Sequence, residues 1–343
     1  MKKIAVAMLL VFILIGIRAN AQTEQKDTTK AKDIKIEKKK LISEEERKAL
    51  DGITKGKSSS AARNKNSQIF ATGAIGQPIP ATGQRYAIVI GLANYSGTVN
   101  DLCAAAAETE AVDSSVYATN DPKYYCQDYD SIHMRDELIN RYGYDPMNIV
   151  VLRDGSATKA NIMQELNNLS LKLNGDDEVA FFYSGHGVSG NYYGIVDGES
   201  VDEAIYTYDG QYVWDDDLKL WADSLQTYRQ VFAFDMCLAG GMNELAGLNR
   251  VIAMSSTETQ SSFTYTIGGI ATTTGYAFSE GLFSHNFVVN GMTNLLADSN
   301  NLKGVTDGDV TVEEAFSYTY PIIKIKQTPV LSDQYVNDLL LGY

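Results

Sequence analysis

The sequence predicts an α/β protein built around a mostly parallel sheet, because buried strand-like runs alternate with helical ones. Short segments at 86–90, 148–152 and 178–183 are almost continuously apolar, as strands covered on both faces must be. Between them, residues 130–142 and 158–173 repeat apolar side chains at the spacing of one helix face. Short links between such alternating elements favour parallel strands joined by right-handed crossovers.

The second half of the chain is predicted to add elements of the same kinds. Strands are expected at 230–234 and 250–254, and helices at 214–225, 275–286 and 312–323. The last helix begins with a capping box made by Thr311 and Glu314. Residues 202–212 form an acidic, aromatic stretch to which no element is assigned.

The first 21 residues have the build of a secretory signal peptide. Two lysines open the chain, an apolar run spans 4–17, and Ala-Asn-Ala at 19–21 forms a small-x-small cleavage site. The apolar run is short for a membrane span, and such a short signal is typical of bacteria. We therefore expect an exported protein of the periplasm, cell surface or medium, with no stable membrane insertion after signal removal.

Residues 22–84 lack a core pattern and are predicted to be a basic pro-region or flexible linker, with the folded domain spanning 85–343. One helix is expected at 41–53, where Ser43 and Glu46 form a capping box. An activating cut would fall after one of the basic residues that follow this helix: Lys55, Lys57, Arg63 and Lys65.

Charge is divided unevenly along the chain. Residues 22–70 hold 13 Lys or Arg against 8 Asp or Glu, and the signal segment adds a net +3, so residues 71 onward carry −22 while the whole chain carries −14. An acidic body argues against nucleic acid as a partner and suits cationic substrates. Solubility alone is the alternative explanation of the same excess.

Three cysteines, Cys103, Cys126 and Cys237, give an odd count. In an exported protein this pattern favours one pair and one free thiol. We pair Cys103 with Cys126, and three unpaired thiols are the alternative. The pair falls within residues 97–127, which look like an insertion into the domain.

Two segments join a buried strand to a reactive side chain. The first, FFYSGHG at 181–187, carries His186 between two glycines, and the second, VFAFDMCLAGG at 231–241, carries Cys237 after its strand. Side chains just past the carboxyl ends of neighbouring parallel strands meet at one edge of the sheet. A nucleophile and its base would therefore come together although 51 positions separate them.

A cysteine beside a histidine is a nucleophile with its own acid and base. The imidazole takes the thiol proton and later protonates a leaving amine. Glycine permits close backbone approach to a substrate, so the amides of Gly187 and Cys237 are expected to hold a developing oxyanion. Taken singly, the cysteine fits a buried small hydrophobe and the histidine a turn residue; together they favour catalysis.

The SGHG and DxC blocks, with the histidine about fifty residues upstream of the cysteine, resemble those of the caspase-haemoglobinase clan of cysteine peptidases. This clan includes caspases, metacaspases, legumains, gingipains and clostripain-like peptidases. The resemblance covers about residues 85–330 and implies a caspase-like three-layer α/β/α sandwich. It implies an endopeptidase with His186 as general acid/base and Cys237 as nucleophile. No cofactor or metal is implied in the chemistry, although metacaspase relatives can require calcium.

Asp235 stands where caspases carry glutamine and where metacaspases and clostripain-like enzymes carry aspartate. The resemblance therefore implies protein or peptide substrates cut after Arg or Lys, and a buried carboxylate indeed needs a cation to offset its desolvation. Asp130 resembles a second residue of the same pocket, with a helix N-cap as the alternative role and Asp101 as the competing candidate. Glu258 stands where clan members place pocket-lining residues.

Other charged groups are assigned ordinary structural roles. Residues 307–314 have the outline of a calcium loop but lack oxygen ligands at its first positions, so a turn is expected. His133 and His285 lie on predicted helices without partners at metal spacing, which argues against a metal site. Three aspartates at 215–217 favour the start of a helix.

Two other functions fit the same residues. One is a caspase-like pseudoenzyme that binds a partner without cutting it, and a peptide probe that fails to label Cys237 would favour it. The other is a transpeptidase or ligase, as in some legumain relatives, which passes the acyl group to an amine instead of water. Product analysis with an added amine would reveal it.

Overall fold

The computed structural model describes residues 31–55, 68–103, 126–192, 201–267 and 277–343. At its centre lies a six-stranded sheet in the order β14-β11-β10-β6-β3-β5, in which five strands are parallel and β14 is antiparallel to β11. The strands are β3 (Arg85–Gly91), β5 (Ile149–Arg153), β6 (Glu178–Ser184), β10 (Arg229–Asp235), β11 (Arg250–Met254) and β14 (Val330–Asp333).

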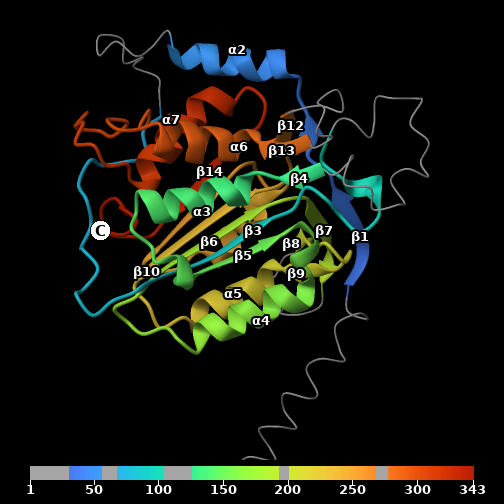
Figure 1. Cartoon of the computed structure of the whole chain (residues 1–343), viewed down its shortest axis with the longest axis horizontal. Helices are drawn as coiled ribbons and strands as arrows, with labels where there is room; N and C mark the ends of the chain where they lie inside the picture. Colours follow the sequence, from blue (N-terminus) through green and yellow to red (C-terminus); the bar gives the residue numbers. More distant parts are fainter. Residues whose placement is uncertain (1–30, 56–67, 104–125, 193–200, 268–276) are drawn as a thin grey trace, which may run out of the picture.

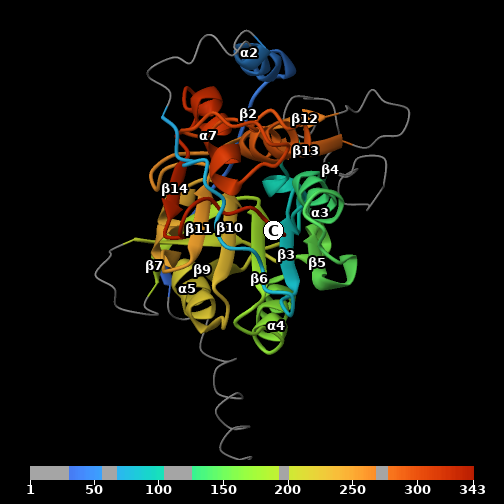
Figure 2. The ribbon, with the colours of Figure 1, turned by 90° about the vertical axis from the view of Figure 1, so that its left-hand side faces the viewer.

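Helices cover both faces of this sheet, because successive strand residues face opposite sides. Phe181 belongs to the core under α4 and α5, whereas Phe182 belongs to the core under α3 and α7. Figure 2 shows the strands between these helices. The predicted three-layer α/β/α arrangement with a mostly parallel sheet is confirmed. The helices are α3 (Asp130–Asn140), α4 (Lys159–Ser170), α5 (Asp215–Ser224) and α7 (Val312–Ile323).

Polar side chains fix the helix starts where the sequence predicts them. The Thr158 hydroxyl accepts a hydrogen bond from the Asn161 amide at 3.3 Å at the start of α4. At the start of α7, the Glu314 amide donates to the Thr311 hydroxyl at 3.2 Å, and the Thr311 amide donates back to the Glu314 carboxylate at 3.0 Å. Such reciprocal bonds satisfy amides that have no partner within the helix.

Two smaller sheets lie beside the central one. The first has the order β1-β7-β8-β9 and the second the order β2-β12-β13-β4. Their strands are β1 (Ala31–Glu37), β2 (Lys40–Leu41), β4 (Cys126–Asp128), β7 (Gly187–Tyr192), β8 (Asp202–Tyr206), β9 (Tyr212–Trp214), β12 (Phe263–Ile267) and β13 (Ala277–Gly281). The stretch at 202–212, which received no sequence assignment, therefore contains a strand.

The helix predicted at 275–286 is wrong at residues 277–281. Residues 277–281 form β13, which pairs with both β12 and β4, and only then do α6 (Leu282–Ser284) and a π-helical segment (His285–Thr293) follow. Pairing on both sides outweighs the helical preference of the isolated segment, because strand formation depends strongly on tertiary neighbours.

The N-terminal segment packs along the domain. Figure 1 shows it running from β1, beside β7, to α2 (Glu44–Lys55), which lies over α7. The predicted capping box at its start is confirmed, with the Glu46 amide donating to the Ser43 hydroxyl at 3.1 Å. Ile42 and Leu50 are buried in the core that also contains α7 side chains. An ion pair of 2.8 Å between Lys326 and Glu46 adds to this contact.

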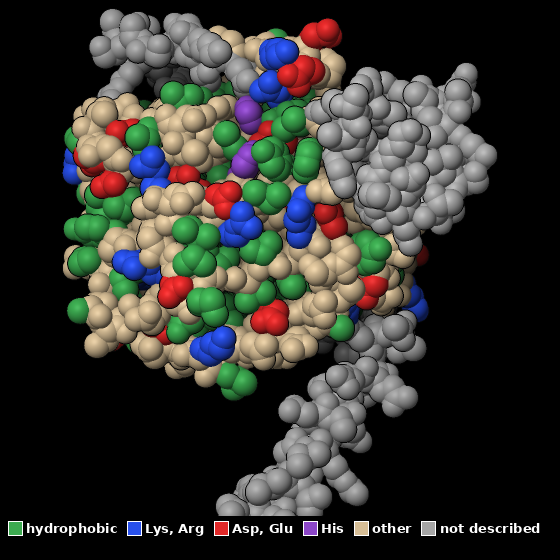
Figure 3. Space-filling view, in the orientation of Figure 1, with side chains coloured by type: hydrophobic (Ala, Val, Ile, Leu, Met, Phe, Trp, Pro, Cys, Tyr) green, Lys and Arg blue, Asp and Glu red, His purple; other side chains and the backbone are tan. Residues whose placement is uncertain are grey.

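The expected disulfide joins Cys103 to Cys126, and Cys237 is a free, buried thiol. Most of the predicted insertion, residues 104–125, lies outside the described residues. On the face shown in Figure 3, acidic and basic side chains are interspersed with apolar ones. Within the described part of the chain, no helix is long and apolar enough to cross a lipid bilayer.

Candidate active site

The loops that carry His186 and Cys237 leave neighbouring strands at the same edge of the sheet. β6 and β10 are parallel partners, with Ser184 opposite Asp235, so each reactive residue follows two positions after the paired end. The Gly185 amide donates to the Asp235 carbonyl at 3.2 Å. A Cβ at Gly187 would clash with the Cys237 carbonyl oxygen. Only glycine permits this close contact between the two loops.

The Cys237 thiol is fully buried and lies against the loop that leads into β12. Its sulfur accepts a hydrogen bond from the Ser262 amide at 3.2 Å. Leu238, the next residue, has a left-handed backbone with φ of 62°, which turns the chain sharply after the cysteine. Burial raises the pKa of the thiol to about 11, so the thiol is protonated at neutral pH in this arrangement.

His186 is held by a contact at each ring nitrogen. Its Nε2 lies 2.8 Å from the Asn100 carbonyl oxygen, and its Nδ1 accepts a hydrogen bond from the Lys39 amide at 3.2 Å. The carbonyl requires a proton on Nε2, so Nδ1 carries the lone pair. The ring stacks on Tyr95 at a centroid distance of 4.9 Å. Burial lowers the pKa of His186 to about 3, which keeps the imidazole neutral.

Asp235 forms a buried ion pair with a residue of the N-terminal segment. The Lys39 ammonium lies 3.0 Å from one Asp235 oxygen, and both side chains are 0% exposed. Ser262 donates its hydroxyl to the same oxygen at 2.9 Å. The second oxygen accepts from the Ser284 amide at 2.9 Å and from its hydroxyl at 2.8 Å. Such bonds are needed to hold a charged pair away from water.

Asp130 lies behind the same ammonium group. The Ser184 hydroxyl accepts from the Lys39 ammonium at 2.9 Å and donates to Asp130 at 2.5 Å. The Gly281 amide also donates to Asp130, at 3.0 Å. Burial raises the pKa of Asp130 to about 7, and the Lys39 charge opposes this rise. We call the groups around this ammonium, from Asp130, Ser184, Asp235 and Gly281, the ammonium site.

The remaining predicted site residues differ in where they lie relative to the ammonium site. Asp101 instead accepts from the Tyr95 amide at 2.8 Å, so Asp130 is the aspartate that shares the ammonium site with Asp235. Gly187 adjoins the cysteine loop. Glu258 is exposed, and its backbone amide lies close to Gly240.

Sequence reasoning missed Lys39, Ser184 and Gly281 as site residues. Lys39 stood within a run of three lysines, which looked like an ordinary solvated stretch. Ser184 stood inside the SGHG motif, just after the predicted strand at 178–183, but was given no role of its own. A side chain at Gly281 would collide with the Asp235 carboxylate, yet nothing in the local sequence marks it.

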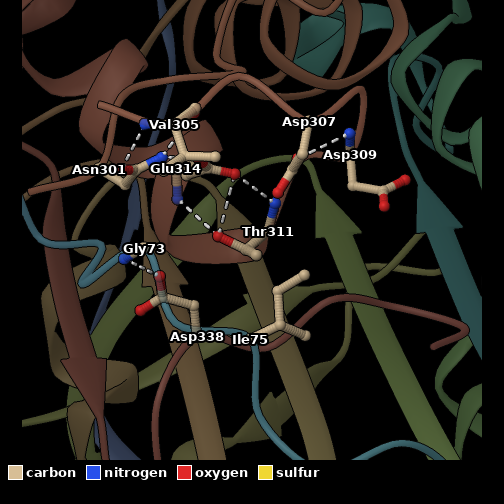
Figure 4. Close-up of a pocket in the computed structure, with 9 residues that line it drawn as sticks. All are labelled: Gly73, Ile75, Asn301, Val305, Asp307, Asp309, Thr311, Glu314 and Asp338. Carbon is tan, nitrogen blue, oxygen red and sulfur yellow. Dashed lines mark hydrogen bonds between the residues drawn. The ribbon is translucent and has the colours of Figure 1, made fainter. Parts of the chain in front are cut away.

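Several acidic groups elsewhere in the described residues have partners within the chain. Residues of the predicted turn at 307–314 line the hollow in Figure 4. There the side-chain amide of Asn301 donates to Glu314 at 2.6 Å, and the backbone amide of Gly73 donates to Asp338 at 2.6 Å. His133 lies 2.9 Å from Glu280. The described residues contain no group of three or more His, Cys, Asp or Glu side chains arranged to hold a metal ion.

The chain is similar to known proteins over a region that includes the two reactive residues. Residues 125–246, which include His186 and Cys237, match the family model described as the metacaspase, peptidase C14 domain. Over 175 residues the chain is 30% identical to Metacaspase-1 of the yeast Kluyveromyces lactis, an alignment that covers 48% of this chain and 35% of the yeast protein. The chain thus spans about a third of the length of that relative.

A solved structure also aligns with this chain. The crystal structure of a protein from Geobacter sulfurreducens aligns with a TM-score of 0.45 and 15% sequence identity. The alignment covers 72% of this chain and 92% of the bacterial one.

Proposed function

We propose that this chain, whose residues 125–246 match the metacaspase, peptidase C14 domain, is a cysteine endopeptidase that cuts peptide bonds after Arg or Lys. The observation that carries the specificity is the Lys39 ammonium, held by Asp235 at 3.0 Å beside the reactive loops. A site that already binds one lysine of its own chain has the charge and depth to bind the basic side chain of a substrate.

In the proposed reaction the cysteine and histidine divide the work. With the site open, Nδ1 of His186 takes the thiol proton, and the Cys237 sulfur attacks the carbonyl carbon of the bond to be cut. The amides of Gly187 and Cys237 donate to the oxyanion. The imidazolium then protonates the leaving amine nitrogen as the carbon–nitrogen bond breaks. Water, deprotonated by the imidazole, hydrolyses the thioester to release the acid product and the thiol.

Charge selects the residue before the cut bond in this proposal. Asp235 and Asp130 would repel an acidic side chain. The Ser184 hydroxyl and the Gly281 amide already donate to Asp130, so an acidic side chain would find no hydrogen-bond donor there. An unpaired buried charge lowers the affinity for a substrate far more than a poor fit does. Burial keeps the pKa of Asp130 near 7. A bound guanidinium or ammonium group favours the ionised forms of both carboxylates.

A panel of fluorogenic peptides that differ only in the residue before the cut bond tests the proposal. The full chain and its Lys39→Gln variant are assayed side by side, since Lys39 fills the ammonium site. We expect Arg and Lys peptides to exceed the Asp peptide in kcat/KM by at least about 100-fold. Faster cleavage after Asp would contradict the specificity, and no cleavage by either form would contradict the peptidase function.

We further propose that the protein is exported. The supporting observations are the lysines, the apolar run at 4–17 and the small residues at 19–21, together with a disulfide that suits an oxidising compartment. Residues 1–30 lie outside the described part of the chain, as do the proposed activation sites at 57, 63 and 65.

N-terminal sequencing after expression in a bacterium tests the export proposal. The exported fraction is expected to begin at Gln22, because the cleavage site lies after Ala21. A matched variant with Leu9→Arg and Leu10→Arg, which interrupts the apolar run, is expected to stay in the cytoplasm with its N-terminus intact. Retention of the unaltered chain in the cytoplasm would contradict the proposal.

A further inference from the structure

We propose that residues 31–42, here called the strap, are a built-in inhibitor of the proposed peptidase site. The strap fills the ammonium site with Lys39, but the peptide bond beside the imidazole precedes Lys39 instead of following it. The full chain is therefore latent while the strap is in place. This inference rests on the proposed function and adds to it the regulation of the same site.

The strap crosses over the two reactive loops and pairs with a strand on either side of them. Its first part, β1, runs antiparallel to β7, with Glu37 opposite Gly187, the residue after the histidine. Its last part, β2, pairs with β12, and the Lys40 amide donates to the Ser262 carbonyl at 2.9 Å. The Ser262 amide in turn donates to the Cys237 sulfur. The strap thus crosses from the strand after the histidine to the strand near the cysteine.

Lys39 anchors the strap at the crossing point. Its ammonium has two oxygen partners, at 3.0 Å on Asp235 and 2.9 Å on Ser184, and its side chain is 0% exposed. Lys38 and Lys40, its two neighbours, have exposed side chains. A buried lysine among exposed ones requires specific partners, because removing an ammonium from water is costly. The contact therefore distinguishes Lys39 from the rest of the basic run.

The register of the strap differs from that of a substrate. Cleavage after a residue requires the imidazole to protonate the amide nitrogen of the following residue. Here the side chain in the ammonium site and the amide on His186 Nδ1 both belong to Lys39. The bond that faces the imidazole is consequently Lys38–Lys39. The Lys38 ammonium, however, lies away from Asp235 and donates to the Val99 carbonyl at 2.7 Å.

The same register also disables the catalytic groups. The Lys39 amide occupies the Nδ1 lone pair that would take the thiol proton. Burial raises the pKa of the Cys237 thiol and lowers that of the His186 imidazole, so the neutral pair is favoured over thiolate and imidazolium. Removing the strap would expose both groups and leave the Nδ1 lone pair free to accept the thiol proton.

Alkylation of Cys237 by iodoacetamide tests the inference without requiring hydrolysis. The full chain is compared with Lys39→Gln, with the matched charge control Lys40→Gln, whose side chain is exposed, and with Ile42→Asp. Ile42→Asp places a charge at the buried end of the strap, which weakens its packing, and leaves the ammonium site unchanged. This variant replaces Lys39→Gln in the test if Lys39→Gln fails to fold. Labelling is measured by mass spectrometry, and cleavage of an Arg peptide is measured in parallel.

Lys39→Gln and Ile42→Asp are expected to be labelled at least about tenfold faster than the unaltered chain, which reacts only during the fraction of time that the strap is away. Lys40→Gln is expected to match the unaltered chain, and hydrolysis should rise with labelling. Equal labelling of all folded forms would overturn the inference, and so would cleavage of the chain after Lys38 or Lys39. Faster labelling with no hydrolysis in any form would support the strap and refute the proposed function.

Discussion

Replacing Cys237 with alanine is expected to abolish cleavage of Arg and Lys peptides, with a loss of at least about 10⁴-fold in kcat. The reason is that no other thiol among the described residues is free: Cys103 and Cys126 form the disulfide. The comparison is made in the Lys39→Gln background, where the ammonium site is open, and the kinetic measurement is the initial rate of peptide cleavage.

The fold should survive this change with a small cost. The Ser262 amide loses the sulfur that accepts its hydrogen bond, and an unpaired buried amide costs about 1–3 kcal/mol. Cys237→Ser retains an acceptor and is the matched control for stability, while it too should be inactive. Circular dichroism and urea unfolding check the fold. Residual activity within tenfold of the parent chain would exclude Cys237 as the nucleophile.

Replacing Asp235 with asparagine is expected to lower the free energy of unfolding by about 3–5 kcal/mol, because it leaves a fully buried ammonium without its carboxylate. Asp130, bridged to Lys39 through Ser184, supplies part of the lost charge, which favours the lower end of this range. Urea unfolding monitored by circular dichroism measures the change.

A double variant separates the ion pair from other effects of the substitution. In Asp235→Asn with Lys39→Met, the buried ammonium is removed together with its carboxylate, and the loss of the Lys39 charge lets burial raise the pKa of Asp130 further and favour its neutral form. Most of the lost stability should therefore return. The double variant should still cut basic peptides poorly, because the substrate cation has lost its main partner. If Asp235→Asn alone lowers the free energy of unfolding by less than about 1 kcal/mol, the ion pair is not buried in solution.

The central sheet could be predicted from the sequence because its strands are buried on both faces. The runs at 86–90, 178–183 and 230–234 are almost continuously apolar, so they are stable only as strands with both faces buried. The parallel order of these strands brings the His186 and Cys237 loops together. The capping boxes that begin at Ser43 and Thr311 could also be predicted, because each is defined by a glutamate three residues after the capping hydroxyl.

The smaller sheets and the ammonium site could not be predicted in the same way. β13 pairs with strands near residues 127 and 265, so its conformation is decided by partners far along the chain. Lys39 has no local feature that separates it from Lys38 or Lys40. Its burial follows from the path of the strap, which depends on pairing with β7 and β12.

The position of β1 determines what kind of polypeptide could take its place. β7 has β8 on one side and β1 on the other, so departure of β1 leaves a row of unpaired amide and carbonyl groups beside the histidine. Only a chain already stretched out over several residues can bond to such a row. Loops and unfolded segments meet that requirement, whereas compact helices do not.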